Sequence, residues 1–270
     1  MTPFVMSLAG LTVRVAPLYG EVAAMCAAYR IDANGAVPAI EPHVQVRVTP
    51  AMIDAERAMG GPGEWSDAYL ETLAVFRAIG ERIPSLDRAI LHGACIEVDG
   101  AAYVFTAPSG TGKSTHIRLW RRYLGARVRV VNGDKPIVHV PADGVPVAHA
   151  TPWAGKERWQ TPLAHAPLAG IAVVTRGTVS TCVRMDASDA MEALLAQLYM
   201  PSDPAQALAT LALADRLLAA VPVYRLTCDI SEDAVRASYT AMTGRPWPMA
   251  ASGEAGASGA SAPPVAGGRR

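Results

Sequence analysis

The sequence has no excess of charge of either sign, because 24 Lys and Arg residues balance 24 Asp and Glu residues along 270 positions. Aromatic residues are also scarce, at 6%. Proteins that hold a nucleic-acid backbone or an anionic membrane surface carry a basic surplus, which is missing here. We therefore expect neither a nucleic acid nor a membrane among the partners of this protein.

Cysteine is rare, and its spacing shows no pattern. Cys26, Cys95, Cys182 and Cys228 lie far apart and form neither a CxxC pair nor a Cys/His cluster. This spacing argues against a structural zinc site and against a disulfide framework. We expect reduced, mostly buried thiols.

Long apolar runs are missing as well, since none reaches the roughly 20 residues that a membrane-spanning helix needs. The first basic residue is Arg14, and no A-x-A cleavage motif follows an apolar stretch near the N-terminus. This is not the pattern of a secretory signal peptide. We expect a cytoplasmic protein.

What the sequence does contain is enough apolar residues, 51%, for one sizeable core with or without a small satellite domain. We expect a small N-terminal α/β module over residues 1–62 and a main domain over 63–248. Residues 249–270 are dominated by Ala, Gly, Ser and Pro. Such a stretch cannot offset the entropy of ordering, so we expect a disordered tail.

Apolar periodicity and turn residues predict the elements of both parts. In the N-terminal module, strands over 11–15 and 44–48 surround a helix over 22–30. At the start of the main domain, Ser66 caps a helix that stops at Gly80. Asp99 and Gly100 separate two apolar runs, 89–98 and 101–106, which predicts a tight antiparallel hairpin. The remaining expectations are a helix over 113–123, strands over 128–131 and 137–140, a hairpin-like pair around Arg176 and Gly177, helices over 188–200 and 204–220 (capped by Asp203), a strand over 223–227 and a helix after Ser231.

Residues 107–114, APSGTGKS, match the pattern of a phosphate loop (P-loop, Walker A), with Ala107 in place of the usual first glycine. Gly110 and Gly112 allow the backbone to turn so that its N–H groups point at phosphate oxygens. The helix that begins near Lys113 adds the positive end of its dipole. An apolar strand leads into the loop and a helix leads out of it, as the pattern requires.

The side chains of this loop suit a nucleotide with Mg²⁺. Lys113 supplies a mobile charge for the outer phosphates, and the Ser114 hydroxyl can bind the metal. The alternative is a glycine-rich strand-to-helix turn that binds nothing. The predicted nucleotide-binding residues are Pro108, Ser109, Gly110, Thr111, Gly112, Lys113, Ser114 and Thr115.

A phosphotransferase also needs a carboxylate beside the phosphates, to hold Mg²⁺ or to accept the proton of the acceptor. Asp134 has the expected place, because it follows the strand over 128–131 and stands at a turn after Asn132 and Gly133. Ser114 and Asp134 are therefore the candidate metal ligands. The alternative for Asp134 is a solvated turn aspartate.

Three segments together resemble the HPr kinase/phosphorylase superfamily, which is related to phosphoenolpyruvate carboxykinases. They are LHGA at 91–94 with the Asp99–Gly100 turn, TAPSGTGKST at 106–115 and NGDKP at 132–136. The resemblance covers about residues 89–242 and is strongest to HPr-kinase-like proteins of bacterial peptide-maturation clusters. It implies a mixed α/β fold with a P-loop kinase core like the HPr kinase C-terminal domain, behind a small N-terminal α/β cap. Because HPr kinases are hexamers, the resemblance also implies that this protein could form a homo-oligomer.

The resemblance gives roles to individual residues. It implies that His92 lies close to the transferring phosphate, that Lys113 acts on the phosphates and that Asp134 accepts the proton of the acceptor hydroxyl. From its position alone, His92 fits a half-buried strand histidine, satisfied by the backbone, better than a site residue. Gly133 stands where HPr kinases usually have the first of two adjacent aspartates. That departure leaves a reverse, phosphorylase-type reaction open.

Two further groups have both a functional and a plain interpretation. The segment TPWAGKE at 151–157, with Trp153, Gly155 and Lys156, could close over a nucleotide or acceptor, or be a surface loop that Trp153 pins to the core. Lys135 could pair with a phosphate or with a neighbouring carboxylate. The helix after the phosphate loop carries three arginines, Arg118, Arg121 and Arg122. We expect them to form a solvated face and to interact with the helix dipole, rather than to contact a substrate.

The sequence therefore predicts an ATP- and Mg²⁺-dependent kinase that transfers the γ-phosphoryl group to a hydroxyl of a peptide, protein or small molecule. A rival from another class is a regulatory module that uses the bound nucleotide as a switch. Within the kinases, a small-metabolite kinase competes with a peptide kinase.

Overall fold

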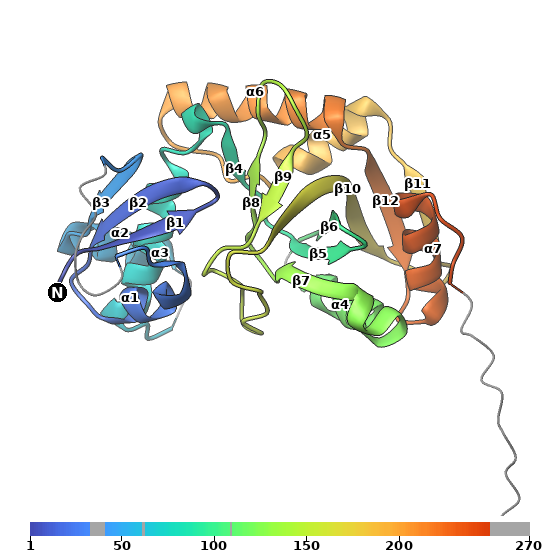
Figure 1. Ribbon diagram of the computed structural model, residues 1–270, viewed down its shortest axis with the longest axis horizontal. Coiled ribbons are helices and arrows are strands. Elements are labelled where there is room, and N and C mark those ends of the chain that lie inside the picture. Colours follow the sequence, from blue (N-terminus) through green and yellow to red (C-terminus); the bar gives the residue numbers. More distant parts are fainter. Residues whose placement is uncertain (33–40, 61–62, 109, 249–270) are drawn as a thin grey trace, which may run out of the picture.

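The computed structural model describes residues 1–32, 41–60, 63–108 and 110–248. Two expectations, the disordered tail over 249–270 and the role of Ser109, lie outside these residues. The fold is mixed α/β, with two sheets and helices around them (Figure 1). All four cysteines are free; Cys182 is half-buried and the other three are buried, as the spacing predicts.

The N-terminal part is a three-stranded sheet covered by helices. Its elements are β1 (Phe4–Leu8), β2 (Leu11–Ala16), α1 (Glu21–Met25), η1 (Ala27–Tyr29), β3 (Val44–Arg47), α2 (Pro50–Met59) and α3 (Asp67–Gly80). β2 lies in the middle, antiparallel to β1 and parallel to β3. Every second residue of β2 is buried, so one face of this strand packs into the core.

Sequence signals found only some of these elements. Ser66 caps α3 as predicted, since its hydroxyl accepts from Tyr69 N at 3.2 Å. The helix expected over 22–30 is instead split into α1 and the 3₁₀ turn η1, while β1 and α2 were not predicted. α3 packs against α1 and α2, so a helix beyond the expected boundary at residue 62 lies with the N-terminal elements.

The main part is a nine-stranded mixed sheet with helices on both faces. Its strands are β4 (Arg88–Ile90), β5 (Ala94–Val98), β6 (Ala101–Thr106), β7 (Val128–Asn132), β8 (Ile137–His139), β9 (Val147–His149), β10 (His165–Arg176), β11 (Thr181–Arg184) and β12 (Val223–Cys228). The order is β4-β8-β9-β10-β6-β5-β7, with β12 beside β10 and β11 beyond β12. Helices α4 (Lys113–Leu124) and α7 (Glu232–Thr243) cover one face, and α5 (Ala187–Leu195) and α6 (Pro204–Ala220) cover the other (Figure 1).

The hairpin predicted from the Asp-Gly pair is present. Asp99 and Gly100 have φ angles of 51° and 83°, the left-handed values that a two-residue hairpin turn requires. Val98 pairs with Ala101 across the turn, so β5 and β6 are antiparallel. This hairpin delivers the chain to the loop that follows Thr106.

The hairpin-like pair predicted around Arg176 and Gly177 is wrong. β10 and β11 do follow each other in the chain, but β12 lies between them, parallel to β10 and antiparallel to β11. A local pattern cannot reveal a strand that arrives from about 45 residues away through α5 and α6. Because β6, β10 and β12 are parallel, their carboxyl ends share one edge of the sheet.

One buried contact behind this edge has a measurable consequence for stability. His116 of α4 is packed beside Phe105, and its Nε2 accepts a hydrogen bond from Trp120 Nε1 at 3.0 Å. Burial lowers the pKa of His116 to about 3. The ring is therefore neutral in the folded protein at pH values where the unfolded chain takes up a proton, near 6.5.

We expect folding stability to fall as the pH is lowered below about 6.5, because the unfolded state then binds more protons. His116 alone accounts for about 2 kcal/mol lost between pH 6.5 and 5, at about 1.4 kcal/mol per pH unit. His116→Leu removes this contribution, and Trp120 Nε1 keeps a partner in Ser238 Oγ at 3.1 Å. Urea unfolding at several pH values measures the slope; an unchanged slope in the variant would contradict the assignment.

Candidate active site

The loop between β6 and α4 has the backbone conformation that its glycines predict. Gly110 and Gly112 have φ angles of 79° and 127°, a region that side chains strain to adopt. A Cβ at either position would meet nothing within 4 Å, so the space in front of the loop is open. Ala107 is not among the residues of positive φ, which explains why alanine can replace the first glycine of the pattern.

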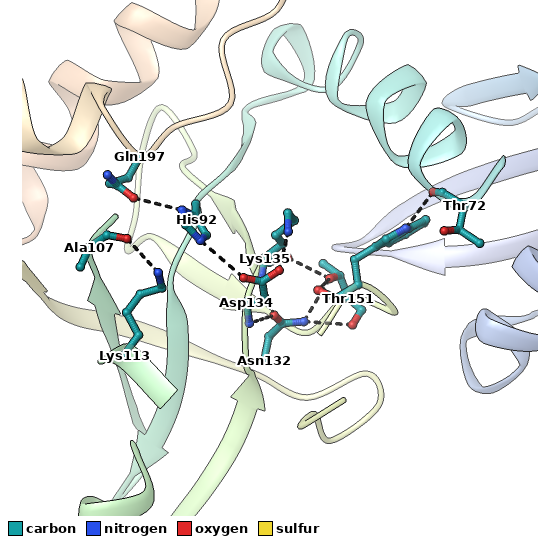
Figure 2. Close-up of polar contacts among 10 residues, drawn as sticks. Thr72, His92, Ala107, Lys113, Asn132, Asp134, Lys135, Thr151 and Gln197 are labelled. Carbon is teal, nitrogen blue, oxygen red and sulfur yellow. Dashed lines mark hydrogen bonds and ion pairs between the residues drawn. The ribbon is translucent and has the colours of Figure 1, made fainter. Parts of the chain in front are cut away.

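Lys113 folds back over this loop. Its Nζ donates to Ala107 O at 2.8 Å and to Pro108 O at 3.4 Å, and only 8% of the residue is exposed (Figure 2). Burial lowers the pKa of Lys113, and the nearby Asp134 partly opposes this shift. Among the described residues, the hydrogen-bond partners of this cation are neutral carbonyls, so it is a suitable partner for an anion.

The start of α4 is open to an anion as well. Gly112 at the N-cap has no side chain to bond the first amides, and the first turn contains no acidic residue. Backbone N–H groups and the helix dipole at such an end favour a phosphate. Ser114 is half-buried and Thr115 is exposed in this turn, so their hydroxyls could bind a phosphate or Mg²⁺.

Arg176, which was not predicted as a site residue, holds the β6–α4 loop through two of its backbone carbonyls. From the carboxyl end of β10 its Nε donates to Thr111 O at 3.1 Å and its guanidinium to Gly110 O at 2.6 Å. Holding these carbonyls fixes the peptide planes whose N–H groups face the other way. No local spacing reveals this role, because β10 is brought beside β6 only by the sheet.

We expect Arg176→Ala to weaken Mg-ATP binding about tenfold, because two hydrogen bonds that orient the loop are lost at about 1 kcal/mol or less each at this exposed position. Titration calorimetry measures the change. Arg225→Ala is the matched control, since Arg225 is also exposed but pairs with Asp189 of α5. An affinity equal to that of the wild type would show that Arg176 does not shape the loop.

Asp134 lies on a turn that is held by hydrogen bonds of buried polar side chains. Asn132 at the end of β7 accepts from Asp134 N at 2.9 Å and from Lys135 N at 2.7 Å. Its amide Nδ2 donates to the carbonyl and the hydroxyl of Thr151, each at 3.0 Å. Asn132 and Thr151 are fully buried, so this turn is held in place independently of the Asp134 side chain.

The structure brings His92, Asp134 and Lys135 together. Lys135 Nζ forms an ion pair with the neighbouring carboxylate, Asp134 Oδ2. His92 Nε2 lies 3.5 Å from Asp134 Oδ1. In Figure 2, His92 lies between Lys113 and Asp134.

His92 is fixed from both sides. Its backbone N donates to Gln197 O at 2.8 Å, and its Nδ1 is hydrogen-bonded to Gln197 Oε1 at 3.1 Å. Thr106, the last residue of β6, donates its hydroxyl to His92 O at 2.6 Å. Burial and then Lys113 lower the pKa of His92, so the ring is neutral at pH 7. The sequence gave no signal for Gln197, which arrives from the segment after α5.

The segment over 151–157 contacts Asp134 through Gly155. With a φ of 75°, Gly155 lies so close that an added Cβ would be 2.9 Å from Asp134 Cβ. Trp153 has a different place: its Nε1 donates to Thr72 O at 2.9 Å, and its ring stacks on Phe76 at 4.5 Å. Trp153 is thus buried against α3, as in the interpretation of a loop pinned to the core, whereas Lys156 is exposed.

Gly133, the departure from the family pattern, lies in a crowded position. A Cβ there would be 3.0 Å from Ala154 O and 3.1 Å from Trp159 O. The aspartate that HPr kinases usually have at this place would need the segment over 154–159 to move. The site therefore presents a single aspartate at this turn.

Comparisons with known proteins find similar solved structures, but no match in sequence. No protein-family model matches the chain, and no curated protein matches it in sequence. A solved structure described as the Hpr(Ser) kinase/phosphatase from Coxiella burnetii aligns with 48% of this chain and 92% of its own, at 12% identity and a TM-score of 0.26.

Two absences hold for the described ranges, 1–32, 41–60, 63–108 and 110–248. None of their helices combines the length and the apolar content needed to cross a membrane. They also contain no cluster of three or more His, Cys, Asp or Glu side chains able to hold a metal ion.

Proposed function

We propose that the protein is an ATP- and Mg²⁺-dependent kinase that phosphorylates a hydroxyl. The observation that supports the proposal most strongly is that Asp134 lies across from Lys113 of the β6–α4 loop (Figure 2). Thr106 at the start of the loop bonds His92 O, and His92 Nε2 lies 3.5 Å from Asp134. An open anion-binding loop and a carboxylate across from it are the two parts that phosphoryl transfer needs.

In this proposal each residue has one task. Amides of the loop and Lys113 bind the β- and γ-phosphates, and Arg176 keeps the loop in shape. Asp134 takes the proton of the acceptor hydroxyl as its oxygen attacks the γ-phosphorus, and the bond from that phosphorus to the β–γ bridging oxygen breaks to release ADP. Mg²⁺, held by Ser114 and Asp134, would neutralise phosphate charge. His92 lies beside this carboxylate, with its Nε2 3.5 Å from Asp134 Oδ1.

The alternative is a nucleotide-dependent switch that phosphorylates nothing. The ion pair between Lys135 and Asp134 favours it, because the ammonium group competes with an acceptor hydroxyl for the carboxylate. In that case the loop would bind nucleotide and Asp134 would hold Lys135.

Incubation with Mg²⁺ and γ-labelled ATP separates these functions. The acceptors to test are peptides, proteins, amino acids and small metabolites, with Lys113→Ala as the control. The proposal expects label in one acceptor class and none with the control. Slow release of phosphate without any labelled acceptor would support the switch and overturn the kinase.

A further inference from the structure

Five cationic side chains form one exposed region beside the site, which we call the basic surface. They are Arg118, Arg121 and Arg122 on α4 and Lys156 and Arg158 in the segment after Gly155. Thr115, Arg118 and Arg122 follow helical spacing, so this stripe begins at the phosphate-binding end of α4. It runs for about 10 Å along the helix at 1.5 Å per residue.

The cations of the basic surface mostly lack carboxylate partners among the described residues. Only Arg118 has one, Glu157 at 3.6 Å. The nearest strands offer no others, because Glu97 is paired with Arg129, and Asp99 with Arg127 and Arg245. Elsewhere, arginine–carboxylate pairs within 4 Å are common: Arg30, Arg57, Arg77, Arg216 and Arg225 each have one, and Arg236 has two. The basic surface is thus a cluster of cations, most of them without a carboxylate partner among the described residues, in a chain of zero net charge.

Packing on Trp159 holds part of this surface in shape. The guanidinium groups of Arg118 and Arg121 lie 5.0 and 5.5 Å from the centre of its ring. Beside them is a shallow pocket lined by Arg118, Arg121, Arg122, Gly125, Ala126 and Val128. Side chains already stacked lose less freedom when they bind a carboxylate.

The basic surface borders the candidate active site. Its segment is continuous with Gly155, which touches Asp134, and Trp159 O lies 3.1 Å from where a Cβ of residue 133 would be. Its helix is continuous with Lys113 and the loop. An acceptor with a hydroxyl at Asp134 can therefore extend over this region.

We propose that the basic surface binds an acidic stretch of a peptide or protein acceptor, next to the hydroxyl that is phosphorylated. This inference rests on the proposed kinase function and narrows its acceptor class. Five cations spread over a helix and the neighbouring segment suit several carboxylates in sequence better than one small metabolite. Arginine binds carboxylates in bidentate fashion and attracts them from a distance.

Binding of a fluorescent peptide tests this without ATP. The probe is a serine peptide with a run of glutamates; the reference peptide has glutamine at the same positions. Arg121→Glu with Arg122→Glu reverses two charges of the surface. Arg184→Glu with Arg225→Glu reverses two exposed charges on β11 and β12 and is the matched control. Fluorescence anisotropy of the full chain gives the affinities at low and at moderate salt.

We expect the wild type to bind the glutamate peptide about tenfold tighter than the glutamine peptide, with the difference reduced by salt. The α4 double variant should lose about tenfold or more, and the control double variant about twofold or less. Equal binding of both peptides, or an unchanged affinity of the α4 variant, would overturn the inference. Tighter binding of a single-stranded oligonucleotide of the same charge, in competition with the peptide, would overturn it in favour of nucleic acid.

Mg-ATP affinity of the same preparations separates the two proposals. If acidic peptides bind the basic surface but no nucleotide binds the loop, the kinase fails while the surface stands. If nucleotide binds and transfer occurs equally to acidic and neutral acceptors, only the surface fails. Where transfer is seen, the α4 double variant should raise KM for an acidic acceptor and leave kcat unchanged.

Discussion

Asp134→Asn is expected to lower the rate of phosphoryl transfer by about 100- to 10,000-fold while Mg-ATP affinity changes by about threefold or less. The amide has the shape of the carboxylate but cannot take up the proton of the acceptor. The turn should survive, because Asn132 and not the Asp134 side chain bonds the two backbone N–H groups. Single-turnover measurements with saturating Mg-ATP give the rate of the chemical step.

Asp143→Asn is the matched control for this substitution. Asp143 is also a turn aspartate next to a glycine, Gly144, but it is exposed and lies outside the candidate site. Its transfer rate should equal that of the wild type. Full activity of Asp134→Asn would remove Asp134 from the chemistry. Lys135→Met adds a further comparison, since it frees Asp134 from its ion pair and leaves the carboxylate in place.

Lys113→Ala is expected to weaken Mg-ATP binding by about 100-fold, close to 2.7 kcal/mol, because a charge-assisted contact to the phosphates is lost. The free protein should unfold at a similar or higher temperature. Burial disfavours the charged form of Lys113, as its lowered pKa shows, so its removal costs little without nucleotide.

Thermal unfolding with and without Mg-ATP checks both parts of this expectation. The wild type should gain stability with nucleotide, and Lys113→Ala should gain almost none at the same concentration. Arg184→Ala, an exposed substitution on β11, should respond like the wild type. An equal nucleotide-induced shift in Lys113→Ala would contradict a role for Lys113 in binding phosphates.

Elements with strong local signals could be predicted from the sequence. The Asp99–Gly100 turn, the Ser66 cap and the Asp203 cap of α6 each place an element through a side chain or backbone preference of a few neighbouring residues. The position of β12 between β10 and β11 could not be predicted, because it depends on pairing between strands far apart in the chain. β1 and α2 carry weaker signals: β1 is apolar over almost all its residues, without alternation.

The candidate site likewise contains residues that local motifs predict and residues that they do not. His92, Lys113 and Asp134 come from short motifs, and the structure places them around one space. The residues that position them come from distant segments: Gln197 lies 105 residues from His92, and Arg176 lies 66 residues from Gly110. Trp153 was open between two interpretations because only the neighbouring α3 supplies its partners, Thr72 and Phe76.

The most direct test of the account is a crystal structure of the protein with Mg²⁺ and a non-hydrolysable ATP analogue. The account predicts that Lys113 Nζ leaves Ala107 O and Pro108 O for a phosphate oxygen. It also predicts that amides of the β6–α4 loop point at the phosphates, with the γ-phosphate facing Asp134. A nucleotide bound elsewhere, with Lys113 still on the loop carbonyls, would contradict the central claim that this loop binds the phosphate donor.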